Sequence, residues 1–337
     1  MTDPGIPIGL RDGFGRVHDD LRISITDRCN LRCAYCMPEE PEWFPRSEML
    51  SYEEILRLVR ILARRGLRKI RLTGGEPLLR RDLPSLIERL VNEPAIEDLS
   101  LTTNGVLLDR CAADLRRAGL DRINVSLDTL VPERYVAMTR RDLLDRALQG
   151  IRAAVDAGLR PVKVNTVLMR GINDDEVEPL VERAREQGWE LRFIEEMPLA
   201  NGGAWAMRGI VTGDEVRARI HSRWPLLPAR QVDPHAPATR YDFADGKGSV
   251  GFINSVSAPF CSSCSRLRLT SDGQLRVCLY DDDELDLKTP LRAGATDGEL
   301  DRMILDRLSR KGRGGALDIL EGRAALPLNR TMHQIGG

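Results

Sequence analysis

Short apolar segments alternate with longer amphipathic segments from residue 21 to about residue 196. The short segments place apolar side chains at every second position, as strands do, whereas the longer ones repeat them at helical spacing. Such β/α repeats favour a parallel sheet with right-handed helical crossovers. The predicted strands are Arg22–Thr26, Lys69–Thr73, Asp98–Thr103, Arg122–Asp128, Val162–Val167 and Glu190–Glu195, and the predicted helices are Ser51–Arg65, Asp82–Asn92, Leu107–Ala118, Leu143–Ala157 and Asp174–Gln187.

Local signals mark the ends of several of these helices. Ser51 followed by Glu54 has the spacing of a capping box, and Gly66 and Gly188 stand where helices commonly end. Six β/α units are two fewer than the eight of a closed TIM barrel. We therefore expect an α/β fold, an incomplete (β/α)6 TIM-type barrel, over residues 1–200.

The pattern changes after Met197. Residues 225–240 are rich in Pro and Arg and are predicted to be a loop or linker. Three short strands follow, and Ser271–Gln274 has the composition of a hairpin turn. We expect a smaller α+β appendage over residues 201–337, with strands at Val250–Ser257, Ser265–Ser271 and Gln274–Tyr280.

Composition narrows the classes of function. The 337-residue chain is 42% hydrophobic and 30% charged, with a formal net charge of −1, which argues against a nucleic acid recognised by bulk charge. No apolar run approaches the ~20 residues of a membrane span, and Met1–Gly15 lacks the apolar centre of an export signal. We expect a cytoplasmic protein with no nucleic-acid and no membrane partner.

Six of the seven cysteines form two triplets, a spacing that in a cytosolic chain points to metal binding rather than disulfides. Cys29, Cys33 and Cys36 follow the first strand, where barrel enzymes keep their chemistry. Each iron of a four-iron cluster takes one thiolate, so three cysteines leave one iron open. A zinc site would need four ligands, and no histidine lies nearby in the sequence. Cys111 lies at helical spacing from Leu108 and Leu115, on the apolar face of a predicted helix. We expect it to be a buried core thiol.

The first triplet resembles a known family. The spacing C-x3-C-x2-C, with Tyr35 before the last cysteine, is similar to that of the radical S-adenosylmethionine (SAM) superfamily. The resemblance implies a [4Fe-4S] cluster whose open iron binds SAM and whose electron cleaves SAM to methionine and a 5′-deoxyadenosyl radical. Gly74-Gly75-Glu76-Pro77, after the second strand, resembles another motif of that family. By the same resemblance, the SAM-binding residues are Tyr35, Gly75, Glu76, Ser126 and Met197.

Period-two alternation places an unusual set of side chains inside the barrel. Arg22, Arg71, Lys163 and Arg192 all face inward, although barrel interiors usually hold Val, Ile and Leu. Converging cations are unfavourable unless an anion meets them, so we expect a small, highly charged ligand such as a triphosphate. The alternative is that each cation pairs with a nearby carboxylate. Lys163 is the strongest argument against this alternative. Arginine is abundant in the chain, but lysine occurs only five times, so an inward-facing lysine is less expected by chance.

The second triplet is Cys261, Cys264 and Cys278, again three thiols without an evident fourth ligand. A zinc ribbon would need a second C-x2-C pair, so a second [4Fe-4S] cluster with an open iron is favoured. Arg266 and Arg268 lie between these cysteines on one strand face, where they would extend the basic cavity.

Together these features resemble the GTP 3′,8-cyclase family of molybdenum cofactor biosynthesis. The resemblance runs from about Leu21 to Gly337 and rests on segments such as TDRCNLRCAYCMP and FCSSCSRLRLTSDGQLRVCL. It implies a lyase in which the radical removes the C3′ hydrogen of GTP and the C3′ radical attacks guanine C8, giving 3′,8-cyclo-7,8-dihydro-GTP. It also implies that the open iron of the second cluster binds the guanine and that Gly336 and Gly337 form a catalytic tail. The implied GTP-binding residues are Arg22, Arg71, Thr102, Lys163, Arg192, Arg266 and Arg268.

The resemblance further implies partners: an external one-electron reductant, a downstream cyclic pyranopterin monophosphate synthase that takes the product, and a homodimer. Two other classes of function stay open at this point. One is a radical SAM enzyme that modifies peptides and carries an auxiliary cluster. The other is a zinc-binding protein without catalysis.

Overall fold

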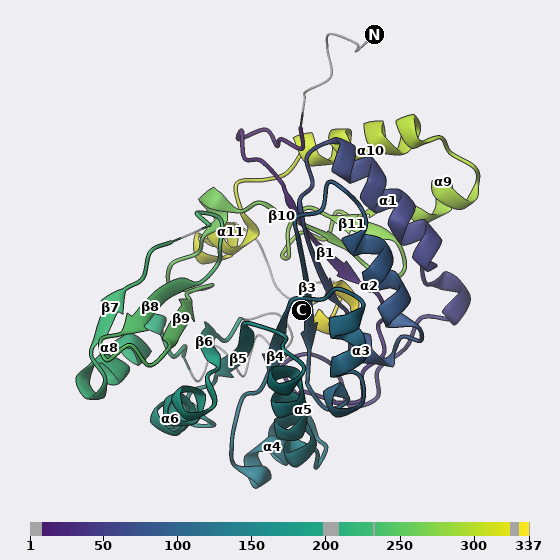
Figure 1. Ribbon diagram of the computed structural model, residues 1–337. Helices are drawn as coiled ribbons and strands as arrows, with labels where there is room; N and C mark the ends of the chain where they lie inside the picture. Colours follow the sequence, from purple (N-terminus) through teal and green to yellow (C-terminus); the bar gives the residue numbers. More distant parts are fainter. Residues whose placement is uncertain (1–8, 198–208, 232, 324–329, 337) are drawn as a thin grey trace.

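A single mixed sheet organises the molecule. The computed structural model describes residues 9–197, 209–231, 233–323 and 330–336. Within them the strand order is β12-β11-β10-β1-β2-β3-β4-β5-β6-β9-β8-β7, with open edges (Figure 1). The strands are β1 (Asp20–Ser24), β2 (Lys69–Thr73), β3 (Asp98–Thr103), β4 (Arg122–Ser126), β5 (Val162–Leu168), β6 (Glu190–Glu195), β7 (Leu226–Pro228), β8 (Thr239–Phe243), β9 (Ser249–Ile253), β10 (Arg266–Leu269), β11 (Gln274–Arg276) and β12 (Leu285–Asp286).

The six predicted β/α strands are confirmed, and the fold is the expected open barrel. Neighbouring strands from β1 to β6 pair in parallel. The C-terminal strands join this same sheet at both edges, because β9 pairs in parallel with β6 and β10 pairs in parallel with β1. The C-terminal strands therefore extend the barrel sheet at both of its edges.

One prediction for this region is wrong. Residues 225–240 are not entirely a linker, because β7 and the start of β8 lie within them and pair antiparallel with each other. β7 has only three residues and ends in Pro228, and β8 begins with two exposed polar residues. Neither strand therefore has the alternating run of four or more residues by which a strand is recognised in a sequence. The predicted hairpin at Ser271–Gln274 is confirmed by the antiparallel pairing of β10 with β11.

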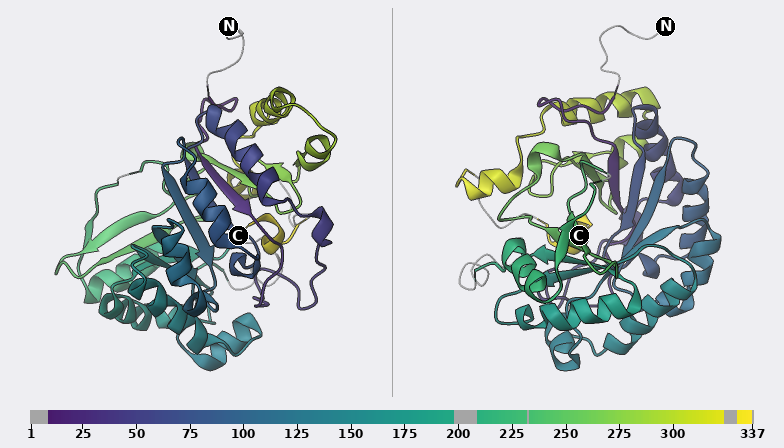
Figure 2. Two further views of the ribbon diagram at one scale, coloured as in Figure 1. Left: turned by 45° about the vertical axis from the view of Figure 1, so that its right-hand side comes forward. Right: turned by 60° about the vertical axis from the view of Figure 1, so that its left-hand side comes forward.

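Helices α1 to α6 wrap the convex outer face of the sheet, and α12 lies on the inner side (Figures 1 and 2). At the start of α1, Ser51 and Glu54 form the predicted capping box. The helices are α1 (Tyr52–Arg64), α2 (Leu83–Val91), α3 (Ala112–Arg117), α4 (Pro132–Thr139), α5 (Leu144–Asp156), α6 (Val177–Gln187), α8 (Gly213–Arg223), α9 (Lys288–Arg292), α10 (Asp297–Ser309), α11 (Gly315–Leu320) and α12 (Met332–Ile335).

The hydrophobic core lies between the sheet and the outer helices. Leu21 and Ile23 of β1 are fully buried there, while Arg22 between them faces the inner side. Cys111 packs against the same core, and its thiol donates to the Leu107 carbonyl at 3.3 Å. It is partly buried and not fully buried as predicted, because it lies at the start of α3 and not within it.

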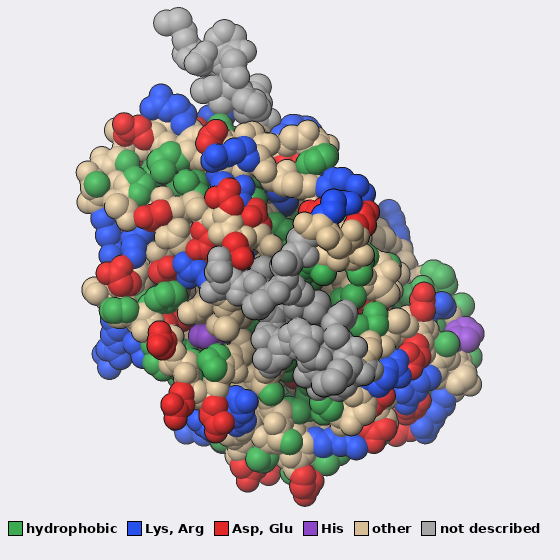
Figure 3. Space-filling model, turned by 180° about the vertical axis from the view of Figure 1, so that it is seen from behind, with side chains coloured by type: hydrophobic (Ala, Val, Ile, Leu, Met, Phe, Trp, Pro, Cys, Tyr) green, Lys and Arg blue, Asp and Glu red, His purple; other side chains and the backbone are tan. Residues whose placement is uncertain are grey.

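Charges of both signs are interspersed on the face seen in Figure 3, in keeping with the small net charge of the chain. Among the described residues no helix is both long and apolar enough to cross a bilayer.

Candidate active site

The first cysteine loop leaves β1 and packs directly against the turn after β2. The Gly75 amide donates to the Thr26 carbonyl at 2.8 Å, and the Glu76 amide donates to the Arg28 carbonyl at 2.7 Å. A Cβ on Gly75 would lie 2.4 Å from the carbonyl oxygens of both Asp27 and Arg28. Only glycine allows this close approach, so the Gly74-Gly75 pair fixes the position of the cysteine loop.

Glu76 is buried behind the residues that line the cavity. Its buried carboxylate accepts hydrogen bonds from the Thr103 hydroxyl at 2.7 Å and from the amides of Asn104 at 2.8 Å and Leu78 at 3.0 Å. The Asn104 side chain in turn contacts the Cys29 sulfur at 3.8 Å. Burial raises the pKa of Glu76 to about 7. In this structure Glu76 braces the end of β3 and does not line the cavity.

The thiols of the first triplet lie in surroundings that disfavour free thiolates. Burial, followed by the charge of Glu76, raises the pKa of Cys29 to about 11. Burial and the neighbouring Cys29 raise that of Cys36 to about 12, and burial, Cys36 and Asp128 raise that of Cys33 well above its usual range. Bound metal must therefore displace the thiol protons.

The spacing of the thiols bears on which metal group they hold. Among the described residues, no three His, Cys, Asp or Glu side chains converge closely enough for one metal ion. A cluster spreads its thiolates over separate irons, whereas zinc gathers them around one ion. Three cysteines provide one thiolate for each of three irons of a four-iron cluster, whereas a structural zinc site needs four ligands.

Tyr35 is held by a buried carboxylate at the end of β4. Its hydroxyl donates to Asp128 Oδ2 at 2.8 Å, and Asp128 Oδ1 accepts the Val167 amide at 2.8 Å. Burial raises the pKa of Asp128 to about 6. Ser126 and Met197 line the same cavity, on β4 and just after β6.

The second triplet lines the same cavity as the first. Cys261 and Cys264 flank a 3-10 turn before β10, and Cys278 follows β11. Two glycines allow close packing here: a Cβ on Gly314 would lie 2.6 Å from the Cys261 sulfur, and one on Gly315 would lie 3.4 Å from the Cys278 sulfur. Burial raises the pKa of Cys264, but the charges of Arg266 and Lys311 outweigh burial and lower it to about 7.

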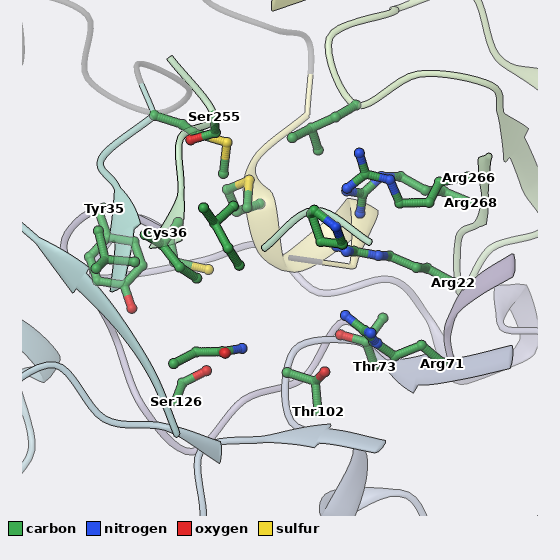
Figure 4. A pocket seen from close by; sticks show the side chains of 18 of the residues that line it. Arg22, Tyr35, Cys36, Arg71, Thr73, Thr102, Ser126, Ser255, Arg266 and Arg268 are labelled. Atoms are coloured by element: carbon green, nitrogen blue, oxygen red, sulfur yellow. The ribbon is translucent and has the colours of Figure 1, made fainter. Parts of the chain in front are cut away.

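Both triplets line one cavity of about 300 Å³. The strand register brings three arginines side by side, since Arg22 of β1 pairs with Arg71 of β2 and with Arg268 of β10. Figure 4 shows Arg22, Arg71, Arg266 and Arg268 on one side of the cavity and Tyr35 and Cys36 on the other.

The arginines of the cavity repel one another. Burial, and then the charges of Arg268 and Arg71, hold the pKa of Arg22 well below its usual range. Among the described residues, the Nε atom of Arg22 is buried without a hydrogen-bond partner. Such a cluster is stable only when an anion fills it or when each charge is compensated elsewhere.

Two family models match consecutive parts of the chain. The Radical SAM superfamily model matches residues 23–184, and the Molybdenum Cofactor Synthesis C model matches residues 189–316. A GTP 3′,8-cyclase of Rhodopirellula baltica is 46% identical over 342 residues, covering 100% of this chain and 94% of the relative. One of Pelotomaculum thermopropionicum is 47% identical, covering 97% of this chain and 100% of the relative. The chain belongs to the GTP 3′,8-cyclase family of radical SAM proteins.

A solved structure supports the fold alone. SuiB of Streptococcus suis, bound to its precursor peptide SuiA, matches with a TM-score of 0.60 and 14% identity, covering 93% of this chain and 68% of SuiB. At this identity the likeness shows that the cyclase family shares an open-barrel architecture with that protein and carries no information on substrate.

Lys163 and Arg192 differ from the other cations of this cyclase-family site. Arg192 Nη2 lies 2.5 Å from Glu190, and Lys163 Nζ lies 3.9 Å from the same carboxylate. Both side chains therefore pair with a carboxylate, which was the alternative to an anion-binding role. The expectation that Lys163 would argue most strongly against such pairing is wrong. Burial and the charge of Arg192 lower the pKa of Lys163 to about 8. Arg192 lines the cavity but Lys163 does not.

The C-terminal helix α12 reaches the cavity. The His333 amide donates to the Cys36 sulfur, and the Gly336 carbonyl accepts from Arg268. A Cβ on Gly336 would lie 2.8 Å from the Thr73 side chain. This segment touches both halves of the site; Gly337 lies outside the described residues.

The structure gathers most of the sequence-predicted residues around one cavity. Those that line it are Cys29, Cys33, Tyr35, Cys36, Gly75, Thr102, Ser126, Arg192, Met197, Cys261, Cys264, Cys278, Arg22, Arg71, Arg266 and Arg268. The sequence assigned no role to Asn104, Asp128 or Lys311. Asn104 and Asp128 lie two positions after Thr102 and Ser126, which the sequence did single out. Lys311 could have been noticed because it is one of only five lysines.

Proposed function

We propose that the chain is a GTP 3′,8-cyclase, a lyase that converts GTP to 3′,8-cyclo-7,8-dihydro-GTP in the first step of molybdenum cofactor biosynthesis. The observation that carries the proposal is that two cysteine triplets and a group of arginines line one cavity. The names and full-length coverage of the curated relatives support it.

The residues present fit two [4Fe-4S] clusters and SAM. Cys29, Cys33 and Cys36 would hold the first cluster, and Cys261, Cys264 and Cys278 the second, each with three thiolates. When bound, the first cluster and SAM supply a 5′-deoxyadenosyl radical, which takes hydrogen from the ribose C3′ of GTP. Tyr35, Gly75, Ser126 and Met197 are the residues proposed to border SAM, with Glu76 supporting them from behind the wall.

The arginines would bind and orient GTP. Arg22, Arg71, Arg266 and Arg268 lie on one side of the cavity. Guanidinium groups bind phosphate oxygens through paired hydrogen bonds. A triphosphate bound to them would neutralise their mutual repulsion. GTP would then be held with its guanine at the open iron of the second cluster and its ribose C3′ toward the first triplet. Thr102 and Arg192 line the cavity from β3 and β6. Lys163, on β5, does not line the cavity and would act on GTP through its charge alone.

The same proposal includes its partners and place in the cell. A cytoplasmic one-electron reductant would serve the first cluster, and a cyclic pyranopterin monophosphate synthase would take the product. We include a homodimer as part of this proposal.

Isotope transfer tests the proposed reaction directly. Protein reconstituted under anaerobic conditions should hold about eight irons, four for each cluster. With SAM, a reductant and GTP deuterated at the ribose 3′ position, we expect deuterium in the 5′-deoxyadenosine. GTP deuterated at C8 serves as the control and should transfer none. Cleavage of SAM without label from the 3′ position would contradict the proposal.

A further inference from the structure

A buried chain of polar side chains runs behind the second triplet, outside the cavity. The Lys311 ammonium lies 4.0 Å from the Cys264 sulfur, 3.3 Å from the Arg266 carbonyl and 3.4 Å from His18 Nδ1. His18 Nε2 lies 3.0 Å from Asp12 Oδ2. Lys311 is 3% exposed and His18 is 0% exposed, so bulk water does not solvate this chain of contacts.

The chemistry of the groups fixes the direction of the hydrogen bonds. An ammonium can only donate, so His18 Nδ1 accepts from Lys311, and the Nε2–H of His18 therefore donates to Asp12. Burial and the charge of Lys311 lower the pKa of His18 to about 4, which keeps the ring neutral at neutral pH. The Asp12–His18 pair thus orients the ammonium toward the Cys264 sulfur.

A turn at residues 12–16 connects these side chains to the second triplet through hydrogen bonds. Arg16 is paired with Asp12 at 2.6 Å and donates to the Cys261 carbonyl at 2.8 Å and the Gly312 carbonyl at 2.6 Å. The same turn therefore holds the backbone of one cluster cysteine and the segment that carries Lys311. Such supporting contacts orient metal ligands and tune the metal.

Lys311 forms no ion pair with a carboxylate among the described residues, although it is almost fully buried. Its polar neighbours are a neutral ring, a carbonyl oxygen and a sulfur. The other charged groups that act on it are Cys264, Cys278, Arg16 and Asp12. An uncompensated buried ammonium is costly, and an anionic cluster with its thiolates would compensate it.

We propose that Lys311, oriented by His18 and Asp12, is a positioning residue that hydrogen bonds to the Cys264 thiolate and raises the reduction potential of the second cluster. The inference rests on the proposed function, because it requires a cluster at this triplet. Potentials of iron–sulfur clusters depend on net charge, hydrogen bonds to sulfur and solvent exposure. A fixed positive charge stabilises the reduced, more negative state.

Redox titration followed by electron paramagnetic resonance tests this role. The full-length protein is reconstituted in a background in which the first three cysteines are changed to alanine, leaving the second cluster alone. Lys311→Met should shift its redox equilibrium toward the oxidised state by at least about tenfold, or about 59 mV for one electron. Lys311→Arg should restore most of the shift. Lys247→Met, at an exposed lysine, should cause none.

A further variant separates orientation from charge. His18→Gln keeps the ammonium but removes the ring that aims it, so we expect a smaller shift in the same direction. It also carries the test if Lys311→Met fails to retain the cluster. A wild-type reduction potential in Lys311→Met would overturn the inference while leaving the proposed function intact. If Lys311→Met fails to retain the cluster, a wild-type potential in His18→Gln would have the same meaning. Absence of a second-cluster signal in the parent background would overturn both.

Discussion

The two cysteine triplets contain the same number of thiols but differ in the charged groups that lie beside them. The first is flanked by the buried carboxylates of Glu76 and Asp128, which help raise the pKa values of its thiols. At the second, Arg266 and Lys311 lower the pKa of Cys264 to about 7. The cavity is therefore polarised, because the Asp128 carboxylate lines it beside Tyr35 and the first triplet, whereas Arg266 and Arg268 line it beside Cys264. Such a site can orient two ligands of opposite charge: SAM, with its sulfonium and ammonium groups, and a triphosphate.

The largest expected effect separates the roles of the two triplets. Cys33→Ala should abolish formation of 5′-deoxyadenosine, because the first cluster can no longer supply the electron. Cys264→Ala should retain SAM binding and the first cluster but form no cyclised product. Chromatography of 5′-deoxyadenosine and of the nucleotide products measures both. Equal loss of SAM binding in the two variants would remove the functional distinction between the triplets.

Next in size is the effect of removing one charge from the basic end. Arg22→Met should weaken GTP binding about 10- to 150-fold, the value of a lost hydrogen bond to a charged group. The same change should raise the free energy of unfolding of the metal-free protein by about 1 kcal/mol or more, because a crowded buried charge is removed. Calorimetry of binding and denaturant unfolding measure the two effects.

The control for this variant is Arg110→Met, at an exposed arginine, which should change neither quantity. A parallel loss of stability and of GTP binding in Arg22→Met would mean that Arg22 is a structural residue rather than a ligand for GTP.

A smaller effect should be confined to the first triplet. Gly75→Ala places a Cβ against the Asp27 and Arg28 carbonyls, and overpacking of this kind destabilises by about 1–3 kcal/mol. We expect fewer irons at the first site and a normal second cluster, measured by iron analysis and cluster spectroscopy. Gly298→Ala, in α10 with open space around it, is the matched control. Equal loss of iron from both sites would argue against a local effect.

The smallest effect concerns pH. Because the pKa of Lys163 is lowered to about 8, its positive charge is present below that pH and is lost above it. GTP affinity should therefore fall about three- to fivefold between pH 7 and pH 9, the scale of one partly screened charge. Lys163→Arg should flatten this dependence, since arginine stays protonated. An identical pH profile in both proteins would exclude Lys163 as the titrating group.

The sequence predicted the barrel well because each β/α unit carries its own periodic signal. β2, β3 and β6 begin and end at the predicted residues, and inward-facing Arg22 and Arg71 followed from strand alternation alone. The position of β9 and β10 at opposite edges did not follow, because pairing between distant strands leaves no local pattern. The pairing of Lys163 with Glu190 and the burial of Lys311 beside Cys264 likewise depend on tertiary contacts.

The central claim is that each triplet holds a cluster whose open iron takes a different ligand. Electron paramagnetic resonance of the reduced protein, with two matched backgrounds in which one triplet or the other is changed to alanine, tests it most directly. SAM should alter the spectrum of the first cluster only, and GTP that of the second cluster only. If both ligands altered the same cluster, or if neither did, the account of a polarised two-cluster site would be contradicted.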